Sequence, residues 1–176
     1  MPSDTTIVAG IEIPSTSPIF LTIAGVHVLL GLACVISGAG AMLSAKRRGS
    51  HPTSGTIYFW CLSALFVSAT GLFLVRWAED YHLFVLGALS FGSAVIGRSA
   101  RRYQWPKWAR LHISGMGASY ILLLTAFYVD NGKNLPLWKD FPPVTYWLLP
   151  GVIGTPIIVR ALLRHPLIRH AHNASV

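Results

Sequence analysis

Five blocks of apolar residues, each about as long as a helix that crosses a lipid bilayer, constrain the fold of this chain more than any other feature. The blocks cover residues 18–44, 55–77, 81–100, 111–129 and 144–163. A helix needs about 20 residues to cross the ~30 Å hydrocarbon layer. Because 53% of the residues are hydrophobic and only 11% are charged, the chain is too apolar for a soluble globule. The sequence therefore predicts an all-α integral membrane protein.

The first four blocks predict an antiparallel four-helix bundle over residues 18–129. The fifth, within 144–164, contains Pro150 and Pro156 with Gly151 and Gly154, which predicts a kinked helix at the periphery. We expect residues 1–17 to form an exported N-terminal arm, because Asp4 and the lack of a basic start do not suit a cleaved signal peptide. Residues 130–143 are an outer loop, and 165–176 are a basic cytoplasmic tail.

The placement of charge predicts the topology. With the N-terminus outside and the C-terminus in the cytoplasm, eleven of the fourteen Lys and Arg residues fall on the cytoplasmic side, whereas all six acidic residues fall outside. This distribution obeys the positive-inside rule of a bacterial inner (cytoplasmic) membrane. The net charge of +8 is therefore explained by insertion and attraction to anionic lipid rather than by nucleic acid.

Four histidines, one on each of the first four blocks, alternate between the two ends of these blocks. They are His27, His51, His82 and His112. Ionisable side chains at membrane depth are costly and usually functional. The helical period places each histidine in a stripe of mostly small residues: Gly31, Cys34, Gly38 and Ala41 with His27; Gly55 and Tyr58 with His51; Leu86, Ser90, Ser93 and Gly97 with His82; Gly115 and Ser119 with His112. Such stripes favour helix contacts, so we expect the histidines to face the bundle.

The alternation predicts two histidine pairs. His27 with His82 would lie toward the outside, and His51 with His112 at the cytoplasmic end. Alternate helices of an up-down bundle are diagonal neighbours, and two opposed imidazoles can hold a haem b iron between them. One or two haems are therefore expected. Their propionates would meet Arg76 outside and Arg47, Arg98 or Arg101 inside. The outer pair is strained, because His27 lies about 13 Å into its helix and His82 almost at the start of its own.

Other roles for these histidines stay open. The two at the interfaces, His51 and His82, can be solvated, and His27 can make a simple interhelical hydrogen bond. The set can also bind zinc or copper or conduct protons, or the protein can be a structural subunit of a larger complex. The cysteines, Cys34 and Cys61, lack a CxxC spacing and are expected to be buried thiols.

Three runs of sequence resemble a known family. They are KRRGSHPTSGTIYFW from Lys46, YHLFVLGALSFGSAVIGRSARR from Tyr81 and ARLHISGMGASYILLLTAFYV from Ala109. They resemble the bacterial membrane proteins grouped as domain of unknown function 2306, over roughly residues 20 to 130. The positions that match the family pattern are His27, then His51, Gly55 and Tyr58, then His82 with Arg98, Arg101 and Arg102, then His112 and Met116. The resemblance implies an integral membrane fold and no settled activity. The chain departs from the family at residues 52–54, where basic residues are common.

The order of the helices and the placement of the histidines also resemble the two-haem transmembrane cytochromes b. This likeness is at the level of architecture alone. It implies a membrane oxidoreductase that passes electrons across the bilayer, with a quinol or redox protein as a possible partner. The sequence does not specify the oligomeric state.

Overall fold

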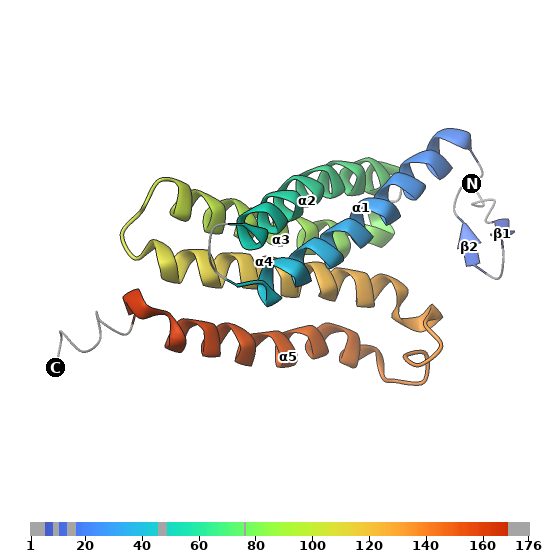
Figure 1. Cartoon of the computed structure of the whole chain (residues 1–176). Coiled ribbons are helices and arrows are strands. Elements are labelled where there is room, and N and C mark those ends of the chain that lie inside the picture. Colours follow the sequence, from blue (N-terminus) through green and yellow to red (C-terminus); the bar gives the residue numbers. More distant parts are fainter. Residues whose placement is uncertain (1–5, 9–10, 14–16, 46–48, 76, 169–176) are drawn as a thin grey trace. The chain divides into compact units, whose positions relative to one another are not determined.

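Five long helices dominate the computed structural model, which describes residues 6–8, 11–13, 17–45, 49–75 and 77–168 (Figure 1). The elements in chain order are β1 (Thr6–Val8), β2 (Ile11–Ile13), α1 (Pro18–Leu43), α2 (Ser50–Val75), α3 (Trp77–Arg102), α4 (Trp108–Asn131), the 3-10 helix η1 (Gly132–Asn134) and α5 (Pro143–Arg164). The five α-helices are each long and apolar enough to cross a membrane. The prediction of an all-helical, multi-pass membrane fold is confirmed.

The helix ends follow local signals in the sequence. Ser17 caps α1, since its hydroxyl accepts a hydrogen bond from the backbone N–H of Phe20 at 3.2 Å, and Pro18 suits the first turn. Four helices begin earlier than the apolar blocks do: α2 at Ser50, where Ser50 and Pro52 suit a helix start, α3 at Trp77 instead of residue 81, α4 at Trp108 instead of 111, and α5 at Pro143 instead of 144.

The N-terminal arm contains a short antiparallel hairpin that the sequence analysis did not predict. Strands β1 and β2 pair with Ile7 opposite Glu12 and Val8 opposite Ile11. β-Branched residues favour extended backbone, and this stretch is rich in them. The hairpin does not change the fold class, because it precedes the first apolar helix.

The chain divides into two compact units, Met1–Phe84 and Val85–Val176, with the division inside α3. In the first unit α1 packs along α2. Its most buried side chains include Cys34, Tyr58 and Leu62, which are at most 2% exposed. Phe84 stacks on Phe73 with ring centroids 4.5 Å apart. Most of the apolar surface of α1, including Leu29, faces outward, as expected for contact with lipid.

In the second unit α3 and α4 cross at two glycines. A Cβ atom added to Gly115 would lie 2.8 Å from the carbonyl oxygen of Ser93 and 2.9 Å from Gly97 Cα. Two turns away, the buried Ser90 hydroxyl donates to the backbone oxygen of Ser119 at 2.8 Å. Small residues thus let the two backbones come into contact, and a hydrogen bond joins them.

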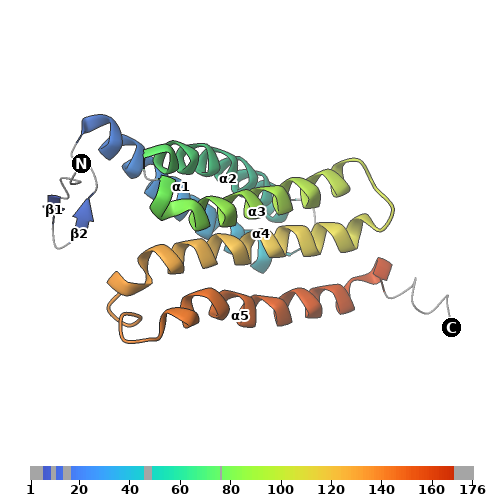
Figure 2. The same cartoon turned by 180° about the vertical axis from the view of Figure 1, so that it is seen from behind.

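Helix α5 lies along α4 in both views of the second unit (Figures 1 and 2). The contact is reciprocal, because Ile158 lies against Gly117 and Ile121 lies against Gly154. Pro150 is inside α5, as is Pro156, and the helix continues through both.

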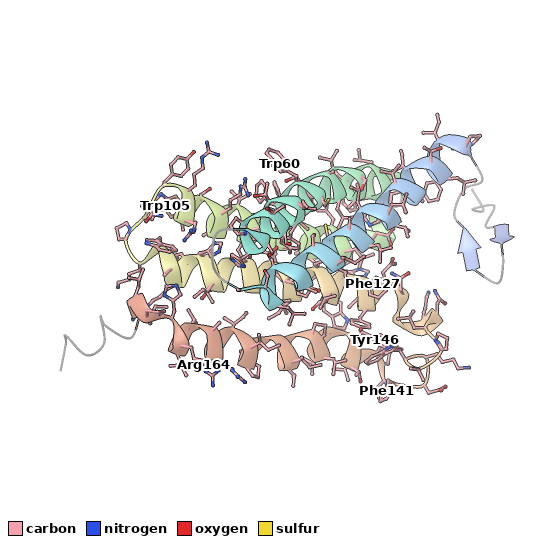
Figure 3. All side chains as sticks on the ribbon, in the orientation of Figure 1. Trp60, Trp105, Phe127, Phe141, Tyr146 and Arg164 are labelled. Atoms are coloured by element: carbon pink, nitrogen blue, oxygen red, sulfur yellow. The ribbon has the colours of Figure 1, made fainter. Side chains whose placement is uncertain are left out.

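The loop between α4 and α5 is fixed by aromatic residues. The buried Tyr146 donates its hydroxyl proton to the backbone oxygen of Trp138 at 2.8 Å. The Trp138 ring contacts Tyr128 and Phe141, at centroid distances of 5.0 and 5.8 Å. Figure 3 labels Tyr146 and Phe141 at this end of the unit. The loop is therefore packed onto the helices that it joins.

Candidate functional site

His27 is held against α2 by a serine. Its Nδ1 atom lies 2.9 Å from the hydroxyl oxygen of Ser68. The Ser68 hydroxyl has one proton and donates it to the backbone oxygen of Leu65 at 2.8 Å. The Ser68 oxygen is therefore the acceptor, and His27 carries its proton on Nδ1.

His51 and His112 make the same kind of bond to backbone carbonyls. His51 Nδ1 lies 2.7 Å from the oxygen of Ala41 on α1, within the first unit. His112 Nδ1 lies 3.0 Å from the oxygen of Gly97 on α3, within the second unit. A carbonyl oxygen only accepts hydrogen bonds, so both histidines are donors through Nδ1.

The shared feature of His27, His51 and His112 is thus a fixed tautomer. When Nδ1 carries the proton of a neutral imidazole, Nε2 is the basic nitrogen and can coordinate a metal. Histidines that ligate metals commonly donate the other ring N–H to a carbonyl or similar acceptor, which orients the ring and raises its basicity. The three side chains therefore share the hydrogen-bonding arrangement that is common among metal-ligating histidines.

His82 lies near the start of α3. Its ring makes an edge contact with Tyr81, with centroids 5.6 Å apart and planes at 83°. Because α3 begins at Trp77, His82 lies about 8 Å from the start of its helix, compared with about 13 Å for His27. Because α3 starts at Trp77, His27 and His82 differ less in their distance from the helix start than the sequence predicted.

The candidate arginines differ in their surroundings. Arg98 is half-buried and directly follows Gly97, the residue whose carbonyl accepts from His112. Arg101 is exposed, and its guanidinium carbon lies 4.8 Å from the centroid of the Trp108 ring. Arg76 and Arg47, which were expected near propionates, lie outside the described residues.

The predicted inward stripes are confirmed by burial. Cys34 and Gly38 are buried on the His27 stripe of α1, and Tyr58 is 2% exposed on the His51 stripe of α2. On α3 and α4, Ser90 and Ser119 are at most 1% exposed. The histidines themselves, His27, His51, His82 and His112, are half-buried. Each therefore lies at the margin of an inward face of its helix.

The two predicted histidine pairs differ in whether both members belong to the same compact unit. His27 and His82 belong to the first unit, whereas His51 and His112 belong to different units. Both pairings stay predictions. Among the described residues, no three or more His, Cys, Asp or Glu side chains form a group that suits a metal ion.

The sequence analysis missed the acceptors of these histidines. Ser68 is the one side chain among them, and it is one of several hydroxyl residues on α2, so the sequence did not single it out. The other two acceptors are the backbone oxygens of Ala41 and Gly97. Such oxygens carry no sequence signal, although both residues belong to the predicted small-residue stripes.

Comparisons of this chain with protein-family models, with curated proteins and with solved structures find no match. Any assignment of function therefore depends on the geometry described above.

We predict that Ser68→Ala loosens the His27 ring. The variant removes the acceptor of the Nδ1 proton, so the Nδ1-protonated tautomer should become less populated and stability should fall by about 1 kcal/mol. ¹⁵N NMR of histidine-labelled protein in detergent measures the tautomer. Ser63→Ala is the matched control, because the Ser63 hydroxyl donates to Phe59 within the same helix. An equal change in both variants would disprove the prediction.

Proposed function

We propose that this protein is a transmembrane b-type cytochrome that binds one or two haems through paired histidines and passes electrons across the membrane. The observation that supports this proposal is the Nδ1–H donation of His27, His51 and His112 to fixed acceptors on a neighbouring helix. A merely solvated histidine at an interface has no need of such an acceptor. A ligand histidine does, because the bond selects Nε2 for the metal.

The inner pair, His51 and His112, is proposed from the similar depth of the two residues in their own helices. His51 is the second residue of α2 and His112 the fifth of α4, so both lie within about 6 Å of the start of their helices. Both helices start on the same side of the membrane if the spans alternate. Both histidines also donate a hydrogen bond to a backbone carbonyl of the preceding helix, so the two residues have the same local hydrogen-bonding arrangement.

The outer pair, His27 with His82, is proposed within the first unit, to which both residues belong. Phe84 of α3 stacks with Phe73 and with Phe66 of α2, at centroid distances of 4.5 and 5.8 Å. These contacts hold the start of α3 against α2 within this unit. The depths of this pair match less well than those of the inner pair, since His27 lies about 13 Å and His82 about 8 Å from the start of its helix.

Arg98 is the better candidate for a propionate of the inner haem. It is half-buried beside the acceptor of His112, whereas Arg101 is exposed and engaged with Trp108. A guanidinium binds a carboxylate with two parallel hydrogen bonds. In this proposal Arg98 neutralises a buried negative charge and fixes the orientation of the bound group.

Bound haem would supply reversible one-electron oxidation and reduction. The residues of the chain would orient the ligands, hold them neutral and keep the interior dry. We place the protein in the bacterial inner membrane with the N-terminus outside, from the distribution of charge. A quinol or cytoplasmic reductant is the proposed donor, and an exported ferric chelate or redox protein the proposed acceptor. The resemblance to domain of unknown function 2306 is part of this proposal.

The contacts of the histidines also suit a simpler role. Interhelical hydrogen bonds stabilise membrane helices by about 0.6 to 1.7 kcal/mol each, and three such bonds would serve a structural subunit. A site for zinc or copper is a further alternative. Neither a structural subunit nor a zinc site absorbs in the visible range, and a copper site lacks the sharp bands of reduced haem b.

The test is an absorption spectrum with metal analysis on the detergent-purified full chain. We expect iron and a reduced-minus-oxidised difference spectrum with the sharp bands of a six-coordinate haem b. A colourless protein expressed with sufficient haem supply would refute the proposal, and stoichiometric zinc in that protein would favour the metal-binding alternative.

A further inference from the structure

Six exposed cations lie at one end of the α3–α4–α5 unit. They are Arg101, Arg102, Lys107, Arg110, Arg160 and Arg164. The end of α3 and the start of α4 are joined by a short loop, and the end of α5 reaches them because the rings of Trp108 and His165 are in edge contact, with centroids 6.2 Å apart. Trp105 and Arg164 mark this end in Figure 3.

No acidic residue balances these charges locally. The sequence contains no Asp or Glu between Asp80 and Asp130, and none after Asp140. The opposite end of the unit differs, because Lys133 and Lys139 there accompany Asp130 and Asp140. One end of the unit is therefore strongly positive and the other is close to neutral.

We propose that this basic end is a binding site for the phosphate of an anionic phospholipid, with Arg101 as its principal contact. The Arg101 guanidinium lies over the Trp108 ring at 4.8 Å, an arrangement that holds the cation in place. A cation that is already oriented loses less entropy when it binds phosphate.

The position of the site favours a lipid over a free phosphate ion. The apolar spans of the unit end or begin at Arg102, Trp108 and Arg164, which places the cations at the level of the headgroups. Indole rings such as that of Trp108 prefer the same layer. An anionic phospholipid offers both a phosphate for the arginine and acyl chains for the exposed apolar surface of the helices.

Native mass spectrometry of the full chain in detergent tests the proposal, with phosphatidylglycerol or phosphatidylcholine added. We expect tighter binding of phosphatidylglycerol to the native chain and about fivefold weaker binding to Arg101→Gln, the effect of one interfacial charge. Arg101→Lys, which keeps the charge, should bind more tightly than Arg101→Gln. Lys139→Gln removes a cation from the opposite end and should bind as the native chain does.

Three outcomes would overturn the proposal. The first is equal binding of the two lipids, and the second is equal binding by Arg101→Gln and the native chain. The third is displacement of phosphatidylglycerol by an equal concentration of inorganic phosphate, which would make the site one for a soluble anion. A misfolded variant is recognised by its far-UV circular dichroism. Arg101→Lys keeps the charge at the site and Lys139→Gln removes a charge elsewhere, so comparing these two variants distinguishes a specific site from a general effect of charge.

Discussion

Replacing Gly115 with alanine should separate α3 from α4 and lower the stability of the protein by about 1–3 kcal/mol. The three atoms nearest to the new methyl group would all be backbone atoms, namely the oxygen of Ser93 and the Cα and N atoms of Gly97, at 2.8 to 2.9 Å. Backbone atoms cannot move aside as a flexible side chain can, so the helices must shift. Alanine gains up to about 1 kcal/mol in helix propensity over glycine, which does not offset the overlap.

Gly92→Ala is the matched control for this prediction. A Cβ atom added to Gly92 on α3 meets nothing within 4 Å, so the same substitution should leave stability unchanged or raise it through helix propensity. Unfolding by a denaturing detergent, followed by circular dichroism, compares the two variants. Equal stability of Gly115→Ala and Gly92→Ala would show that the glycine crossing is not what limits the approach of the helices.

The fold could be predicted from the sequence because the bilayer leaves few solutions to an apolar chain. Each apolar block had to be a helix, since nothing else satisfies a single segment of backbone in lipid. The stripes of small residues then identified the inward faces, and Cys34, Ser90 and Ser119 are buried as expected. The ends were less predictable: α3 starts at Trp77 because amphipathic and acidic residues extend the helix beyond the apolar block.

The candidate site could be predicted only in part. Alternation along the chain identified the four histidines, but their hydrogen bonds depend on how closely the helices approach. The carbonyl oxygen of Gly97 reaches His112 where two glycines allow α3 and α4 to touch, and a hydropathy pattern does not encode the orientation of a carbonyl. The hairpin of residues 6–8 and 11–13 was missed for a related reason, because three-residue strands give too short a pattern to detect.

Replacing His112 with alanine should remove one haem equivalent and leave any other in place. The variant takes away Nε2, the nitrogen that the bond to Gly97 makes basic, and His51→Ala should remove the same equivalent because both residues would hold one iron. Haem content per chain is measured by the pyridine haemochrome spectrum. His165→Ala is the control, since this histidine follows the last residue of α5 and contacts Trp108.

Added imidazole distinguishes a ligand from a structural histidine. If His112 coordinates iron, free imidazole can enter the space left by the alanine and restore the six-coordinate spectrum, although it is not tethered to α4. If His112 only joins α4 to α3 through Gly97, imidazole should restore nothing, and the loss of stability should be about 1 kcal/mol with haem content unchanged. Unchanged haem content in both His51→Ala and His112→Ala would contradict the proposal that these residues form a ligand pair. Unchanged haem content in His27→Ala as well would indicate that the histidines have a structural role.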